Sequence, residues 1–208
     1  MAKNLRYDTN NIPSKIFYNN QPVKFVYWGE EQVWRARPDF LFQNATVDGE
    51  LLTSWNGRVV WNDGSSKLAH YYKDGAMVIE TSASSGYGNE YGGGYEVTTN
   101  WMDLSGIDTL IFNVAHDVDV SIGGWGKSTA TVRIVDNAGK TYSLWSDYID
   151  TADKWRVGPL NLVADLKNSG LNLASCYFRF QNDFKHYAPW GNWYGGGAGF
   201  QLYSIQTQ

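Results

Sequence analysis

Short segments of β-branched and aromatic residues recur from residue 40 to the end of the chain, and turn-forming residues separate them. The segment 95–101 alternates with period two, which is typical of a strand that buries one face. The segments 130–135 and 141–145 flank residues 136–140, whose sequence Asp-Asn-Ala-Gly-Lys is typical of a hairpin loop. This spacing predicts an all-β domain in which two antiparallel sheets pack as a sandwich.

Further strand segments complete the predicted fold. They are 77–81, 109–114, 155–157, 175–180 and 200–205. Strands of this length and spacing favour a jelly-roll topology. Residues 161–167, Asn-Leu-Val-Ala-Asp-Leu-Lys, form the one segment suited to a helix, of about one or two turns.

A ten-residue repeat lies near the start of the chain. Ile-Phe-Tyr-Asn-Asn-Gln-Pro-Val at 16–23 aligns with Val-Tyr-Trp-Gly-Glu-Glu-Gln-Val at 26–33. Each copy is typical of two strands joined by a tight turn, because Asn and Gly tolerate the left-handed conformation. Such a small β-meander buries little area and needs support from the rest of the chain or from a partner. Since Pro38 disfavours continued strand pairing, we predict two domains, 1–37 as an anchoring module and 38–208 as the sandwich.

The composition limits the class of protein. The chain has 208 residues, 43% hydrophobic, which is enough to bury a core. A net charge of −4 argues against nucleic acid as a partner. No segment approaches the roughly 20 apolar residues of a membrane span, so we expect no membrane insertion. A single cysteine excludes an intrachain disulfide, and residues 1–8 contain no apolar signal region, so we expect synthesis in a cytoplasm.

Three stretches, 84–95, 123–126 and 186–197, combine glycine with aromatic residues. Because glycine runs are poor in strands and helices, we predict loops that hold the rings near the surface. Tyr and Trp have an apolar face and a polar tip, as sugars do. The alternative is that these rings fold back as plugs over the ends of the sheets. The candidate ligand-binding residues are Tyr87, Tyr91, Trp125, Trp190, Trp193 and Tyr194, with Asn89 and Asn192 as hydrogen-bonding partners and Glu90 and Asp183 beside them.

The chain shows no recognisable catalytic or metal-binding motif. Its three histidines, at 70, 116 and 186, lack metal-ligand spacing, and no nucleophile elbow occurs. Cys176 lies in an apolar strand pattern, where a buried thiol is expected. Glycoside cleavage needs two facing carboxylates, and sequence does not show that any two converge. We therefore predict a protein that is not an enzyme and has no metal site and no cofactor.

The segment 101–114, Trp-Met-Asp-Leu-Ser-Gly-Ile-Asp-Thr-Leu-Ile-Phe-Asn-Val, resembles one found in galactose-binding-like jelly rolls and carbohydrate-binding modules. The resemblance covers about residues 45–208 and implies a jelly-roll domain that binds glycan. Many such modules hold a calcium ion through an acidic residue of the last strand. The corresponding residues 202–205, Leu-Tyr-Ser-Ile, carry no carboxylate.

The segments 15–19, Lys-Ile-Phe-Tyr-Asn, and 24–29, Lys-Phe-Val-Tyr-Trp-Gly, resemble short modules that open minor structural proteins of tailed bacteriophages. There the module attaches a variable C-terminal domain to the particle. The resemblance implies a virion protein, assembled in the host cytoplasm and oligomeric in the particle. It would contact other virion proteins through residues 1–37 and bind a cell-surface polysaccharide through its jelly roll.

Two rival interpretations stay open. In the first, the chain is a decoration or assembly protein without ligand, and its aromatic stretches pack on neighbouring subunits. In the second, it is a polysaccharide-active enzyme or the ancillary carbohydrate-binding module of one.

Overall fold

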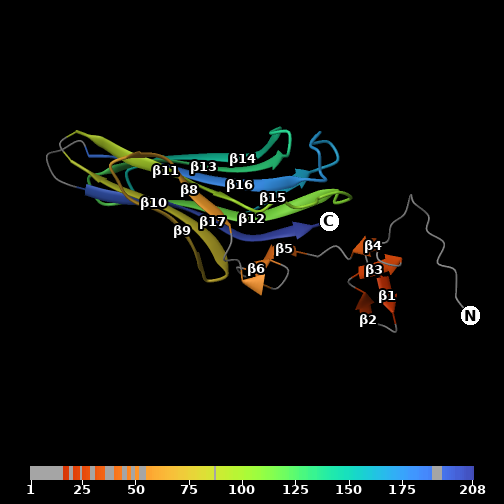
Figure 1. Ribbon diagram of the computed structural model, residues 1–208. Helices are drawn as coiled ribbons and strands as arrows, with labels where there is room; N and C mark the ends of the chain where they lie inside the picture. The colour runs from red at the N-terminus through yellow and green to blue at the C-terminus, as the bar shows by residue number, and fades with distance from the viewer. Residues whose placement is uncertain are drawn as a thin grey trace, which may run out of the picture. The chain divides into compact units, whose positions relative to one another are not determined.

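The chain divides into two compact units, Met1–Asp39 and Phe40–Gln208. The computed structural model describes residues 16–18, 21–23, 25–28, 31–35, 40–43, 46–47, 50–51, 55–86, 88–188 and 194–208 (Figure 1). The predicted domain boundary after residue 37 falls outside the described residues and stays a prediction.

The first unit contains four short strands. They are β1 (Ile16–Tyr18), β2 (Gln21–Val23), β3 (Phe25–Trp28) and β4 (Glu31–Arg35). β1 pairs with β2 and β3 pairs with β4, both antiparallel. Each copy of the ten-residue repeat therefore provides one pair of strands, and each pair is a two-stranded sheet of its own.

The second unit contains the remaining strands. They are β5 (Phe40–Gln43), β6 (Thr46–Val47), β7 (Glu50–Leu51), β8 (Asn56–Asp63), β9 (Ser65–Lys73), β10 (Ala76–Ser85), β11 (Glu90–Thr98), β12 (Thr109–Val120), β13 (Trp125–Asp136), β14 (Thr141–Thr151), β15 (Trp155–Asp165), β16 (Cys176–Tyr187) and β17 (Tyr194–Thr207). In an eight-stranded sheet, β12 lies between β15 and β17. β17 also pairs with β10, which pairs with β9, and with β5, which is followed in the sheet by β6 and β7. A five-stranded sheet has the order β14-β13-β16-β11-β8, and Figure 1 shows the two sheets as stacked layers.

The strand order is that of a jelly roll. From β10 to β17 every connection crosses between the sheets except the hairpin from β13 to β14. This places β10, β17, β12 and β15 side by side in one layer and β11, β16, β13 and β14 side by side in the other. The described residues contain no helix, and hence none that could cross a bilayer. The predicted all-β jelly-roll sandwich is confirmed.

Alternating side chains build the core between the sheets. Along β16 and β12, every second residue is buried for most of the strand length. Phe112 of β12 meets Phe178 of β16 with ring centroids 5.2 Å apart, and Phe180 stacks on Phe200 of β17 at 5.8 Å. All four rings are fully buried, and burial of each stabilises the fold by about 1.5–3 kcal/mol.

The helix predicted at 161–167 is wrong, because residues up to Asp165 continue β15. Leu160, Leu162 and Ala164 turn toward the core, whereas Asn161 and Val163 are exposed. This alternation has period two, and pairing with β12 satisfies the backbone hydrogen bonds of the segment. The apolar residues up to Asp165 thus follow the strand period where a helix of one or two turns was expected.

The glycine stretches are only in part the loops that the sequence predicted. Residues 88–89 and 123–124 lie between strands, and residues 189–193 lie outside the described residues. Residues 92–94 lie inside β11, residues 195–197 lie inside β17, and Trp125 begins β13. A Cβ atom on Gly93 would lie 2.7 Å from Leu68 Cδ2 of β9. The missing side chain therefore makes room for a neighbour from the opposite sheet, which offsets the poor strand propensity of glycine.

Candidate functional site

The outer face of the five-stranded sheet is polar and aromatic. Even-numbered residues of β16 from 176 to 186 point into the core and are buried. The alternate residues point outward and are Tyr177, Arg179, Gln181, Asp183, Lys185 and Tyr187. Since β16 is central in its sheet, this face continues across β13 and β11 on either side.

The antiparallel register arranges the outward residues at one end of this face. Tyr187 lies between Glu90 of β11 and Trp125 of β13. Two residues before Tyr187 in β16, Lys185 lies opposite Lys127 of β13. Lys127 in turn lies opposite Asp150 of β14.

Those six residues line one shallow depression of about 390 Å³: Glu90, Trp125, Lys127, Asp150, Lys185 and Tyr187. The volume lies in the range of small-molecule sites. Trp125 is 45% exposed and Tyr187 is 39% exposed, so both rings offer apolar surface to a ligand. The charged groups beside them can hydrogen-bond hydroxyl groups.

Asp150 holds Trp125 in place. The indole Nε1 of Trp125 donates a hydrogen bond to Asp150 Oδ1, and the hydroxyl of Tyr148 donates to Oδ2 at 3.2 Å. A ring that is fixed before binding loses little conformational freedom when a ligand stacks on it. The exposed ring of Trp125 is therefore held in one orientation.

A second fixed contact lies further along the same face. Trp61 of β8 donates from Nε1 to Asp183 Oδ1 at 2.8 Å, across Gly94 of the intervening β11. A Cβ atom on Gly94 would lie 2.0 Å from that carboxylate oxygen. Gln181 Nε2 donates to the other oxygen at 2.8 Å, and burial raises the pKa of Asp183 against these hydrogen bonds. Gly94 is therefore required for this contact.

The predicted site residues have different positions. Trp125 lines the depression, and Asn89 is exposed but does not line it. Tyr91 and Tyr194 are half-buried, and their rings pack over Gly64 and Gly123, as in the plug alternative. Four residues lie outside the described residues: Tyr87, Trp190, Asn192 and Trp193. The ligand-binding role of all eight stays a prediction.

Sequence reasoning missed Lys127, Asp150, Lys185 and Tyr187. The alternation of β16 is readable in the sequence and separates its outward residues from its buried ones. The depression also needs the register of β16 against β13 and β14, which local sequence does not show.

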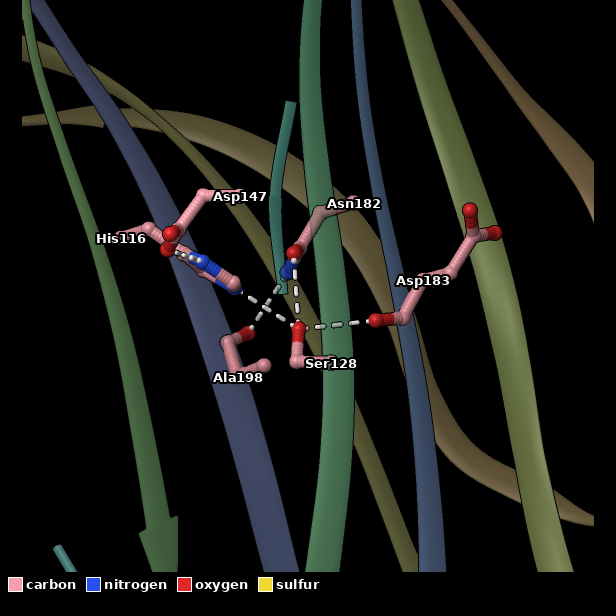
Figure 2. A network of polar contacts seen from close by, with 6 residues as sticks. All are labelled: His116, Ser128, Asp147, Asn182, Asp183 and Ala198. Atoms are coloured by element: carbon pink, nitrogen blue, oxygen red, sulfur yellow. Dashed lines mark hydrogen bonds and ion pairs between the residues drawn. The ribbon is translucent and has the colours of Figure 1, made fainter. Parts of the chain in front are cut away.

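An interior polar network lies between the sheets (Figure 2). His116 Nδ1 of β12 lies 2.7 Å from Asp147 Oδ2 of β14, and its Nε2 lies 2.8 Å from Ser128 Oγ of β13. An ionised carboxylate only accepts, so His116 donates from Nδ1. Burial lowers the pKa of His116, against the opposing effect of Asp147, and so favours the neutral ring.

These three residues have the contacts of a Ser-His-Asp triad, but they do not form an accessible one. Ser128 is 1% exposed and His116 is 0% exposed. Ser128 Oγ also lies 2.8 Å from the carbonyl oxygen of Asp183 and 3.2 Å from Asn182 Oδ1. In this conformation no substrate carbonyl can reach the serine.

The network continues through Asn182, whose Nδ2 donates to Thr81 Oγ1 of β10 and to the carbonyl oxygen of Ala198, both at 3.1 Å. It therefore links both sheets. His116 and Asn182 also lie between two apolar clusters, since Phe180 belongs to the larger cluster and Phe184 to the smaller one. The arrangement is a polar layer that ties the sheets together inside the core.

The other reactive groups of the described residues are not assembled into a site. Cys176 is buried, and burial raises the pKa of its thiol to about 11, so the thiolate nucleophile is disfavoured. In the part of the chain that the structure describes, no three His, Cys, Asp or Glu side chains gather as metal ligands would.

No family model matches the chain, and a comparison with curated proteins gives no match. A solved structure described as "CBM4 structure and function" is 14% identical, covers 80% of this chain and 84% of its own, and has a TM-score of 0.32. A family 11 carbohydrate-binding module from Clostridium thermocellum, in complex with a mixed-linked tetrasaccharide, is 12% identical at 78% and 92% coverage, with a TM-score of 0.28. An exo-beta-agarase is 9% identical over 82% of this chain and 26% of its own, with a TM-score of 0.38.

Proposed function

We propose that Phe40–Gln208 is a glycan-binding domain and that the ligand binds the depression on the outer face of the five-stranded sheet. The observation that carries this proposal is Trp125, whose exposed ring is fixed by Asp150 inside a lined depression. Tyr187 adds a second ring in the same cross-strand row. Rings supply stacking, and polar neighbours orient hydroxyl groups, which is the combination that sugar recognition requires.

We further propose that binding is not accompanied by catalysis. The two carboxylates of the depression already have partners, because Asp150 accepts from Trp125 and Tyr148 and Glu90 pairs with Lys185 at 3.6 Å. A general acid of a glycosidase needs a raised pKa and access to the scissile bond. Asp183, whose pKa is raised, is held by Trp61 and Gln181 instead.

The proposed biological setting is a bacteriophage virion. Residues 1–37 would anchor the chain to other virion proteins, so that the jelly roll is displayed in several copies toward cell-surface polysaccharide. The ten-residue repeat and its two antiparallel strand pairs support a separate anchoring module. Deleting residues 1–36 tests the anchor, since the truncated protein should no longer enter particles.

Glycan binding is tested with the full chain on a glycan array, followed by calorimetry on the hits. Trp125→Ala should weaken binding by about 1–3 kcal/mol, as loss of a stacking ring does. The control is Trp101→Ala, because Trp101 is 57% exposed and packs on Tyr177, about 33 Å along β16 from Tyr187. Equal affinities for both variants would refute the site, and release of reducing ends from a bound polysaccharide would establish an enzyme.

A further inference from the structure

Two lysines of the depression lie directly opposite each other. Lys127 of β13 and Lys185 of β16 form a cross-strand pair on the outer face, and both side chains are exposed. Like charges in this position destabilise a sheet. A sequence with a net charge of −4 nevertheless places both ammonium groups in one depression.

The neighbouring carboxylates leave these charges incompletely paired. Lys185 Nζ lies 3.6 Å from Glu90 Oε2 and 5.7 Å from the centre of the Trp61 ring. Asp150 lies opposite Lys127, but its oxygens accept from Trp125 and Tyr148. Within the described residues the side chain of Lys127 makes no hydrogen bond or ion pair, so the three N–H donors of its ammonium group are available.

The row of rings lies next to the pair of lysines. Trp125 precedes Lys127 by two residues, Tyr187 follows Lys185 by two, and Trp125 lies opposite Tyr187. Two residues along a strand span about 6.6 Å, which is the scale of one sugar ring. A sugar that stacks on Trp125 or Tyr187 would therefore place a substituent over the ammonium groups.

We propose that this depression binds an acidic glycan, with Lys127 and Lys185 together binding a carboxylate or sulfate group of the sugar. The inference rests on the proposed glycan-binding function and adds the ligand class. Both lysines would donate charge-assisted hydrogen bonds to the anion, and its charge would relieve their mutual repulsion. Glu90 and Asp150 at the sides of the pair would repel an anion in any other position, which fixes the orientation of the sugar.

The test uses the full chain and three polymers: polygalacturonate for the carboxylate, dextran sulfate for the sulfate, and dextran as the neutral reference. Binding is measured by affinity electrophoresis and calorimetry at low and high salt. At least one acidic polymer should bind more tightly than dextran, and salt should weaken that binding. Lys127→Gln should lower the affinity about tenfold, the loss expected for hydrogen bonds to a charged group.

The control variant is Lys73→Gln, because Lys73 is exposed at the end of β9 and does not line the depression. If Lys127→Gln and Lys73→Gln bind alike, or if dextran binds as tightly as both acidic polymers, the acidic-ligand inference is overturned. Binding of dextran that depends on Trp125 but not on Lys127 would leave the proposed function standing without this inference. Absence of binding to every polymer and to every glycan of the array would overturn both.

Discussion

Replacing His116 with alanine should strongly destabilise the jelly roll. The variant leaves the Asp147 carboxylate and the Ser128 hydroxyl without the ring that contacts both. Loss of the hydrogen bond to the charged Asp147 carboxylate costs about 1.5–3 kcal/mol, and loss of the bond to the Ser128 hydroxyl costs about 0.5–1.5 kcal/mol. The sum, about 2–4.5 kcal/mol, corresponds to a fall of about 4–18 °C in the unfolding midpoint of a domain this size.

The assay is urea unfolding followed by near-ultraviolet circular dichroism, which reports the packing of core aromatics. A double-mutant cycle of His116→Ala with Asp147→Asn isolates the contact itself, and neighbours in one network should couple by at least about 1 kcal/mol. His70→Ala is the control, since His70 is half-buried and its ring contacts the Tyr95 hydroxyl at 3.1 Å and the backbone of Trp55, both of them uncharged groups. The reasoning fails if His116→Ala costs no more than His70→Ala, or if the cycle is additive.

Three further predictions address other parts of the fold. Gly94→Ala should lower the free energy of unfolding in urea by about 1–3 kcal/mol, because its methyl group would displace Asp183. Gly195→Ala should cost far less, because a Cβ atom there would lie 3.7 Å from its nearest neighbour, Ser84 Cβ. Stability should fall as pH is lowered below about 6.5. Burial lowers the pKa of all three histidines in the folded protein, so the unfolded chain binds more protons in this pH range. His116→Gln should make stability depend less steeply on pH. Cys176 should resist a thiol reagent at pH 8 in the folded protein and react in urea, because its pKa is raised to about 11.

The strand pattern carried most of the fold prediction. The predicted segments 109–114, 130–135 and 200–205 all lie within strands. They could be predicted because one face of each strand packs in the core and the other faces outward, which gives the sequence a period of two. The glycine residues carry no such signal, so loops were predicted where residues 92–94 and 195–197 lie in strands. A glycine shows nothing of its surroundings, and the neighbours that make Gly93 and Gly94 favourable, Leu68 and Asp183, are distant in sequence.

The depression could be predicted only in part. Trp125 was identified by its chemistry, as a ring among glycines. Its partner Asp150 lies 25 residues further along the chain, and its neighbour Tyr187 lies 62 residues further. A register shift of one residue would turn either side chain to the other face, so local sequence cannot decide the pairing.

The interior polar network and the outer site share the same three strands. Ser128, Asp147 and Asn182 each point inward, and each adjoins an outward residue at or near the site: Lys127, Tyr148 and Asp183. Directional hydrogen bonds fix the spacing of β13, β14 and β16 more closely than apolar contacts, which tolerate sliding.

It follows that His116→Ala should lower ligand affinity as well as stability, because it loosens the strands that place Trp125, Asp150 and Lys185. Lys127→Gln should lower affinity alone, since its side chain contacts the ligand and makes no hydrogen bond or ion pair among the described residues. Affinity measured well below the unfolding midpoint of each variant separates the two effects. An unchanged affinity for folded His116→Ala would show that the network stabilises the core without positioning the site.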